Sequence, residues 1–261
     1  MNTKTIGFIG GGRITRIFLE GWQRTGQLPG KIVVSDCNAE TLAKLKARSP
    51  AIVTASLDTA AAQDIVFLAV HPPVMAEMAA AIKGKLKPGA VVVSLAPKFT
   101  VAKLTELLGG FARLARVIPN APSVVNFGFN PVAFGTALSA ADRAEVTALL
   151  TPLGECPEVA EEKLEAYAVL TAMGPTYLWF QLQALRELAS GFGLSEAEFA
   201  PALKRMVCGS TRTLLESGLT PAEVMDLIPV KPLAEMEKKS PKCIKPGCPP
   251  FTKRSNHENT H

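Results

Sequence analysis

The stretch from Thr5 to Arg16, TIGFIGGGRITR, constrains this chain most, because an apolar segment runs into three consecutive glycines. Such a stretch is typical of a buried β-strand that passes through a glycine turn into a helix. Gly10 would form the tight turn, and Gly12 would let the backbone approach a pyrophosphate at the helix N-terminus. Thr15 occupies the third position of the G-x-G-x-x-G pattern, where glycine or alanine is usual. The turn alone is therefore weak support for a phosphate site.

A second β-branched run strengthens this interpretation. Residues 31–36, KIVVSD, end in Asp36, which lies 21 positions after Thr15 and matches the expected acid that hydrogen-bonds the adenosine ribose. The two signals in one βαβ unit predict dinucleotide binding. A carboxylate at this place also favours NADH over NADPH, because it accepts from the ribose 2′-hydroxyl and repels a 2′-phosphate. Arg13 and Arg16, close to the turn, weaken that preference.

Strand and helix patterns alternate through the first half of the chain. Near-continuous apolar runs predict strands that are covered on both faces of a parallel sheet. The further strands are expected near 52–53 and at 64–70, 90–94 and 113–118. Helices are expected at 38–47 and 74–83. Repeated βα units predict an α/β fold with a Rossmann-type doubly wound parallel sheet, whose ligand lies across the carboxyl ends of the strands. The strand-end candidates are Asp36, His71, Pro72, Ala96, Pro97 and Asn120.

From Glu161 onward the apolar pattern is helical. Residues 175–188 leave almost no polar face before glycines at 191 and 193 stop the helix, so this helix must be covered on all sides. A small helical domain can hardly supply that cover, and a second subunit is expected to do so. Capping boxes at 195–198 and 220–223 predict two further helices. Pro201 is expected to kink the first of these or delay its start.

Composition and charge argue against several classes of protein. The chain has 261 residues, of which 48% are hydrophobic, and it is expected to be globular and cytoplasmic, with no signal peptide and no membrane span. Its net charge of +5 arises in residues 238–261, so a solvated tail is expected rather than a nucleic-acid-binding face. The five cysteines offer no metal-binding spacing.

These patterns divide the chain into three segments. Residues 1–158 are predicted to form the dinucleotide-binding domain, and residues 159–239 an all-helical dimerisation domain that also contributes to the substrate site. Residues 240–261 are predicted to be a disordered basic tail, because they are rich in proline, lysine and polar residues without a period.

Several short motifs follow one another in a specific order. They are IGFIGGG at 6–12, FLAVHP at 67–72, RVIPNAP at 116–122, GPTY at 174–177, and CGS at 208–210 followed by LLESG at 214–218 and Pro221. In content and order they resemble the pyrroline-5-carboxylate reductase family over about residues 4–228. The resemblance implies NAD(P)H-dependent reduction of a cyclic imine, 1-pyrroline-5-carboxylate, to proline. It also implies a Rossmann domain followed by a helical domain that interlocks two subunits in a homodimer or higher oligomer.

The chain departs from this family at the loop that binds the substrate carboxylate. The family's SPGGTT loop falls on residues 228–233, IPVKPL, which contain no glycine or threonine and two prolines without N–H donors. Lys231 is predicted to hold the carboxylate with a point charge, although a merely solvated lysine would look the same. Arg13 stands where the family has asparagine, and His71 where it has lysine.

The predicted site combines the glycine turn, the strand ends and the resemblance. Thr171 and Tyr177 are the predicted hydroxyls for the substrate nitrogen, with a core position as the alternative for Tyr177. His71 is expected beside the cofactor ribose, as a contact or packing residue or as a proton shuttle. The predicted cofactor-binding residues are Gly10, Gly11, Gly12, Arg13, Ile14, Asp36, Ser56, Ala69, Val70, His71, Pro72, Ala96 and Asn120.

Two classes of function stay open. The first is an oxidoreductase that uses NAD(H), slightly favoured, or NADP(H) on a cyclic imine, or on another imine or keto acid. The second is a non-catalytic relative that binds a dinucleotide but has lost the substrate loop. The expected partners are a small-molecule substrate and a second copy of the chain, with neither nucleic acid nor membrane.

Overall fold

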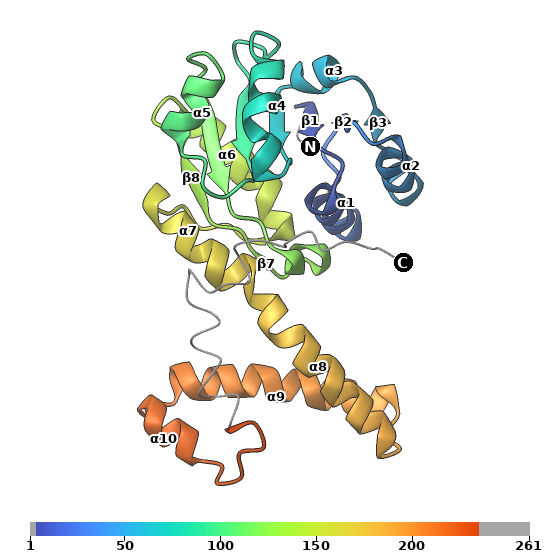
Figure 1. Ribbon diagram of the computed structural model, residues 1–261, viewed down its shortest axis with the longest axis vertical. Helices are drawn as coiled ribbons and strands as arrows, with labels where there is room; N and C mark the ends of the chain where they lie inside the picture. Colours follow the sequence, from blue (N-terminus) through green and yellow to red (C-terminus); the bar gives the residue numbers. More distant parts are fainter. Residues whose placement is uncertain (1–3, 235–261) are drawn as a thin grey trace, which may run out of the picture. The chain divides into compact units, whose positions relative to one another are not determined.

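The computed structural model of the protein describes residues 4–234. The chain forms two compact units, which divide between Thr176 and Tyr177. The first unit is built on a β-sheet and the second is helical (Figure 1). The predicted tail at 240–261 lies outside the described residues.

A seven-stranded sheet organises the first unit, in the order β3-β2-β1-β4-β5-β6-β8. Every neighbouring pair from β3 to β6 is parallel, and β8 runs antiparallel to β6. The strands are β1 (Ile6–Ile9), β2 (Ile32–Ser35), β3 (Val53–Thr54), β4 (Ile65–Leu68), β5 (Val91–Ser94), β6 (Leu114–Val117) and β8 (Val132–Phe134), with a separate parallel pair β7 (Gly128–Phe129) and β9 (Gly154–Glu155). Strand order reverses between β1 and β4, as in dinucleotide-binding sheets, so the predicted Rossmann-type fold is confirmed.

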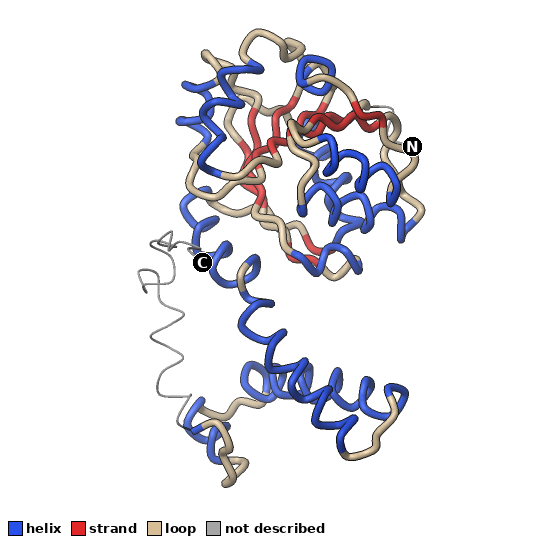
Figure 2. The backbone as a smooth tube through the Cα atoms, turned by 45° about the vertical axis from the view of Figure 1, so that its right-hand side comes forward, coloured by secondary structure: helices blue, strands red, loops and turns tan. Residues whose placement is uncertain are grey.

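Helices cover both faces of this sheet, and Figure 2 shows the strands enclosed between them. Helices α1 and α6 pack on one face, and α3, α4 and α5 pack on the other. The helices are α1 (Arg13–Thr25), α2 (Ala39–Arg48), α3 (Leu57–Ala61), α4 (Met75–Ile82), α5 (Val101–Leu107) and α6 (Ala140–Leu150), with 3₁₀ turns η1 (Pro72–Val74), η2 (Ala121–Val125) and η3 (Thr151–Leu153). Two-sided cover explains why β1, β2, β4, β5 and β6 are buried along their whole length.

An aromatic cluster holds α1 against the sheet. The rings of Phe8 in β1 and Phe67 in β4 are stacked, with centroids 4.8 Å apart, and Phe18 of α1 meets Phe67 edge-on. Trp22 of α1 is fully buried, and its indole Nε1 donates a hydrogen bond to the carbonyl of Leu149, 2.7 Å away. This packing places the N-terminus of α1 at the end of β1.

The first unit ends in a helical segment that lies beyond residue 158, the predicted domain boundary. This segment contains η4 (Glu161–Lys163), α7 (Leu164–Tyr167) and a π-helix, η5 (Ala168–Ala172). Leu164 is fully buried against Ile118 and Ala133 of the sheet region, which explains why the compact unit continues to Thr176.

The second unit consists of most of α8 (Gly174–Gly191), α9 (Glu196–Glu216) and α10 (Pro221–Asp226). Both predicted capping boxes are present, at Ser195 and Thr220. Helix α9 begins directly after Ser195, so Pro201 does not delay its start. The proline ring removes one hydrogen bond to the carbonyl of Ala197, and this turn of the helix is exposed to water.

The described part of the second unit has almost no apolar core of its own. Phe199 is the one large apolar side chain of residues 177–234 that is buried. The exposed large apolar residues of these helices and their connections include Leu178, Trp179, Phe180, Leu185, Leu188, Phe192, Leu194, Leu215 and Ile228. None of the helices among residues 4–234 combines the length and apolar character that crossing a bilayer requires.

Candidate active site

The glycine turn after β1 has the geometry that a phosphate site needs. Gly10 has φ +106°, and a Cβ atom there would lie 2.6 Å from the carbonyl oxygen of Ala69, so only glycine fits without strain. Gly12 is the N-cap of α1, and a Cβ on it would meet nothing within 4 Å. No side chain of the described residues caps this helix, so its first N–H groups are available to an anion.

Thr15 explains how the chain departs from the glycine pattern. Its side chain is fully buried, and its hydroxyl donates a hydrogen bond to the carbonyl of Gly10 over 2.6 Å. The hydroxyl thus satisfies a carbonyl inside the turn, while the small side chain still allows α1 to pack closely on β1. The third position therefore serves the same packing purpose that glycine or alanine serves elsewhere.

Asp36 is held in one orientation at the end of β2. Its Oδ2 accepts from the backbone N–H of Gly11 at 2.7 Å, and its Oδ1 accepts from the N–H of Asn38 at 2.8 Å. Each carboxylate oxygen has a second lone pair left for another donor. The side chain therefore connects the glycine turn to the start of α2 and retains the capacity to accept from a ribose hydroxyl.

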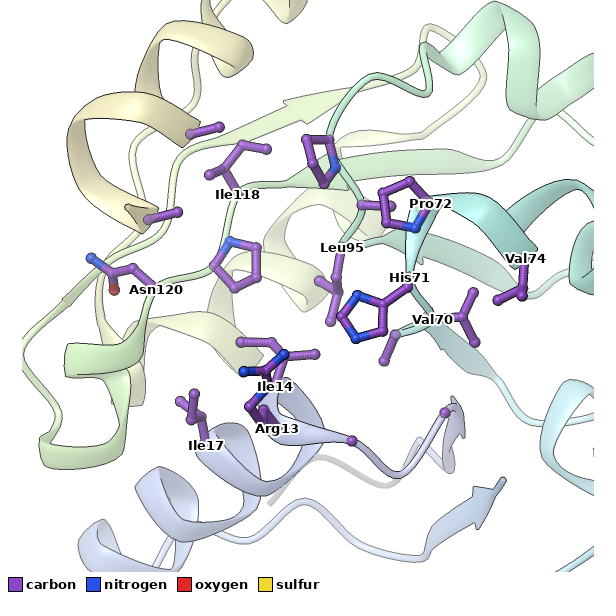
Figure 3. A pocket seen from close by; sticks show the side chains of 18 of the residues that line it. Arg13, Ile14, Ile17, Val70, His71, Pro72, Val74, Leu95, Ile118 and Asn120 are labelled. Carbon is purple, nitrogen blue, oxygen red and sulfur yellow. The ribbon is translucent and has the colours of Figure 1, made fainter. Parts of the chain in front are cut away.

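An open cavity of about 590 Å³ lies over the carboxyl ends of the strands (Figure 3). Figure 3 shows Arg13 and Ile14 entering from the start of α1, with Val70, His71 and Pro72 opposite them on the segment after β4. The predicted cofactor-binding residues that line the cavity are Gly10, Gly12, Arg13, Ile14, Asp36, Ala69, Val70, His71, Pro72, Ala96 and Asn120. The structure thus brings together most of the residues that the sequence singled out.

Two of the predicted residues do not line the cavity. Gly11 turns its N–H toward Asp36. Ser56 is the N-cap of α3, where its hydroxyl accepts from the N–H of Thr59. Their contact with a cofactor stays a prediction.

Further lining residues were not predicted. They are Ile17, Cys37, Val74, Leu95, Ile118, Pro119, Ala121, Ala168 and Ala172. Leu95, Ile118, Pro119 and Ala121 adjoin predicted residues in the chain and could have been found from the strand ends. Ala168 and Ala172 come from the π-helix, and no local pattern indicated that this segment returns to the sheet.

The π-helix is joined to the strand ends through Asn120. Pro175 has no N–H, so it cannot donate to the carbonyl of Thr171, four residues earlier. The side-chain amide of Asn120 points at this carbonyl with an N···O distance of 3.4 Å, and it stands in for the absent donor. The Asn120 Oδ1 accepts from the N–H of Phe129 at 3.1 Å. Asn120 is therefore a structural connector as well as a lining residue.

The three predicted catalytic residues have different positions. Thr171 is in the π-helix beside the cavity, and its hydroxyl donates to the carbonyl of Tyr167 at 2.8 Å. Tyr177 and Lys231 belong to the second unit, where Lys231 is exposed. The proposed contacts of all three residues with substrate stay predictions.

The chain is similar to known oxidoreductases along most of its length. A family model described as NADP oxidoreductase coenzyme F420-dependent matches residues 5–98. The pyrroline-5-carboxylate reductase of Corynebacterium melassecola is 30% identical over 224 residues, which cover 84% of this chain and 83% of the relative. That of Escherichia coli K12 is 29% identical over 227 residues, covering 86% and 84%.

A solved structure shows the same fold. The pyrroline carboxylate reductase of Plasmodium falciparum, with NADP bound, aligns with a TM-score of 0.74 and 20% identity, over 93% of this chain and 92% of that chain. The matches to the two bacterial relatives each span more than four fifths of this chain and of the relative. This chain therefore belongs to the pyrroline-5-carboxylate reductase family.

Proposed function

We propose that the protein is an NAD(P)H-dependent reductase that converts 1-pyrroline-5-carboxylate to proline. The observation that carries this proposal is the cavity at the β1–β4 reversal, which combines an uncapped helix N-terminus with an oriented carboxylate at the end of β2. Family membership supplies the substrate class, because the relatives are named for reduction of this imine.

The cavity suits a nicotinamide dinucleotide. Gly12 leaves the space that a pyrophosphate needs, and the first N–H groups of α1 with the Arg13 side chain would hold its charge. Asp36 would accept from the adenosine ribose. When bound in reduced form, the dinucleotide supplies the hydride for reduction of the C=N bond.

We infer that NAD(H) is preferred over NADP(H). Asp36 is fixed by two backbone N–H groups, so it cannot turn away from a 2′-phosphate without leaving both donors unpaired. Arg13 is the group that opposes this inference, since its charge would attract a phosphate.

The substrate carboxylate needs a positive partner, and the described cavity lining offers none away from the expected pyrophosphate position. Among the described lining residues, the basic side chains are Arg13 and His71, and both adjoin the glycine turn where the pyrophosphate is expected. The rest of the wall is largely apolar. Lys231 aligns with the family's substrate loop, and we propose that it binds the carboxylate in place of backbone N–H groups.

Thr171 is proposed to contact the ring nitrogen. Because its hydroxyl already donates to Tyr167, its oxygen is free to accept a hydrogen bond from a protonated imine. Thr171 would then orient the imine rather than donate the proton.

The activity assay follows oxidation of NADH or NADPH by the purified protein in the presence of the imine. Turnover with proline as product supports the proposal. Dinucleotide binding without turnover of this imine would instead favour a different substrate or a non-catalytic relative. This alternative has a specific basis, because residues 228–233 lack the glycines and threonines of the family loop.

Lys231 is tested by Lys231→Ala, with Lys103→Ala as the control, because Lys103 is an exposed lysine paired with Glu106 on α5. We expect KM for the imine to rise by an amount equivalent to ~1–3 kcal/mol, the range for a lost charge-assisted hydrogen bond, with unchanged dinucleotide affinity. A wild-type KM in Lys231→Ala would remove this account of the substrate site and leave the reductase proposal standing.

We also propose a homodimer or higher oligomer. Side chains such as Trp179, Phe180 and Phe192 are 53%, 66% and 77% exposed, and burying them would contribute about those fractions of the ~1.5–3 kcal/mol that full burial of a large apolar side chain gives. An apolar surface of this extent on one unit is typical of a subunit interface. The cytoplasmic location expected from the sequence stays a prediction.

A further inference from the structure

Arg116 is the most deeply buried charged side chain of the described residues, and the proposed chemistry does not use it. It lies on β6 with 2% of its side chain exposed. Its two terminal nitrogens pair with two carboxylates, Glu161 at 2.9 Å and Glu165 at 2.8 Å. Its Nε has no hydrogen-bond partner among the described residues. Removing a guanidinium from water is costly, and here two carboxylates offset part of that cost.

The two carboxylates extend the cluster to a third segment of the chain. The Oε1 of Glu165 accepts from the backbone N–H of Lys98 at 2.7 Å, and the Oε1 of Glu161 accepts from the N–H of Val101 at 2.6 Å. Lys98 has φ +68°, an unusual conformation for a residue with a side chain. The β5–α5 connection, strand β6 and the η4–α7 segment are therefore joined by the same two oxygen atoms.

Each of these three segments continues directly into the wall of the cavity. The β5–α5 connection supplies Leu95, Ala96 and Pro97, the chain after β6 supplies Ile118 to Asn120, and the π-helix after α7 supplies Ala168 and Ala172. These lining residues come after β5 and β6 or pack beside them. In the sheet, β5 and β6 lie on the β4 side of the reversal between β1 and β4, whereas Asp36 lies on the β1 side, after β2. In a doubly wound sheet that binds its adenosine half beside β2, the nicotinamide half extends toward these strands.

The apolar cluster beneath the π-helix side of this wall is small. This cluster contains three buried residues, Ile118, Ala133 and Leu164, with Val159, Ala168 and Ala172 packed against them. By comparison, the two main clusters of the first unit fill both faces of the sheet. The charged cluster adds hydrogen bonds that join the π-helix side of this wall to β6 and to the β5–α5 connection.

We propose that Arg116, with Glu161 and Glu165, is a positioning residue that sets the wall of the cavity against which the nicotinamide half of the cofactor lies. Arg116 is not a catalytic residue, because it lies behind the wall and does not line the cavity. The proposal rests on the dinucleotide-binding part of the proposed function and adds a determinant that acts on one half of the cofactor.

The test compares binding of the whole dinucleotide with binding of ADP-ribose, which lacks the nicotinamide ring, in wild type and Arg116→Met. If the protein prefers NADPH, the 2′-phosphorylated fragment takes the place of ADP-ribose. We expect the dissociation constant for the whole dinucleotide to rise on the order of tenfold, while the constant for the fragment stays unchanged. We further expect kcat for the imine to fall by up to about a hundredfold, the scale for a misplacement of about 1 Å.

Arg113→Met is the matched control. Arg113 precedes the same strand at its opposite end and pairs with Asp142 at 2.6 Å, remote from the cavity lining. The Arg113→Met variant should bind the whole dinucleotide and the ADP-ribose fragment with wild-type affinity. If Arg116→Met does not fold, Glu165→Gln and Glu161→Gln carry the test, because each removes one charge and keeps an acceptor oxygen; both are expected to change binding in the same direction.

Equal weakening of both ligands by Arg116→Met would overturn the proposal, since a general loss of structure would then explain it. Unchanged binding of the whole dinucleotide in Arg116→Met, or in the two glutamine variants if they carry the test, would overturn it as well. Absence of imine turnover in wild type would count against the proposed substrate alone, because the comparison of dinucleotide with fragment needs no turnover.

Discussion

Replacing Asp36 by serine should invert the preference between NADH and NADPH. Both carboxylate oxygens are anchored, by the N–H groups of Gly11 and Asn38 at 2.7 and 2.8 Å, so the charge has a defined position at the end of β2. The variant removes an acceptor for the ribose 2′-hydroxyl and a charge that repels a 2′-phosphate. It also releases the glycine turn, but that loss weakens both cofactors equally and cancels in their ratio.

The size of the effect follows from charge and distance. Two unit charges at about 4 Å repel by ~1 kcal/mol in water and ~4 kcal/mol near a protein surface, and Asp36 is half-buried. A charge-assisted hydrogen bond to the hydroxyl contributes ~1.5–3 kcal/mol more. With screening by salt, a change of about 2 kcal/mol in relative affinity is a conservative expectation, which corresponds to about 30-fold in the ratio of dissociation constants.

Fluorescence titration of wild type and Asp36→Ser with each cofactor measures this ratio. Glu40→Gln is the control, because Glu40 lies in the first turn of α2, is exposed, and pairs with Lys44 outside the cavity. Tighter binding of NADPH than NADH by wild type would refute the role given to Asp36. So would a ratio that changes no more in Asp36→Ser than in Glu40→Gln.

Three further predictions concern stability and assembly. Gly10→Ala should lose ~2 kcal/mol or more of unfolding free energy, because residue 10 has φ +106° and a Cβ there would lie 2.6 Å from the carbonyl oxygen of Ala69. Gly12→Ala should instead keep the wild-type Tm and lose dinucleotide affinity. Equal Tm values for the two variants would contradict this prediction. Hydrogen bonds from the Lys87 side chain and the Thr5 backbone N–H lower the pKa of Asp64 to about 2. The ionised carboxylate therefore stabilises the folded protein above about pH 4, and this stabilisation is lost as the pH falls toward 2. Asp64→Asn should therefore lower the unfolding free energy at neutral pH by about 1–2 kcal/mol after allowance for solvent screening. Chemical denaturation at a series of pH values should show that the difference in unfolding free energy between wild type and Asp64→Asn becomes smaller in acid. Light scattering of the wild type should give at least the mass of a dimer. Phe180→Asp should dissociate this dimer, whereas Val53→Asp, at an exposed position on β3, should leave it intact. A monomeric wild type at micromolar concentration would exclude the proposed interface.

The sequence alone determined the order of the elements and the residues on the glycine-turn side of the cavity. The run at residues 65–70 is apolar throughout because both faces of a parallel strand are covered, and this pattern is local. The same holds for the glycine turn and for the capping boxes of α9 and α10, since each is a pattern of residues close together in the chain. Asp36 is identified by its fixed spacing from the glycine turn within one βαβ unit. The structure also accounts for Thr15, whose hydroxyl bonds the turn from within.

Tertiary structure alone decided the opposite wall of the cavity. Ala168 and Ala172 have no signal of their own, and they reach the cavity because Leu164 is buried on the sheet and Arg116 binds two glutamates that lie 45 and 49 residues further along the chain. Contacts at such separation leave no periodicity in the sequence, because neither partner constrains its neighbours. Local patterns therefore predicted the glycine turn and the strand ends, and long-range charge pairing and packing determined the opposite wall of the cavity.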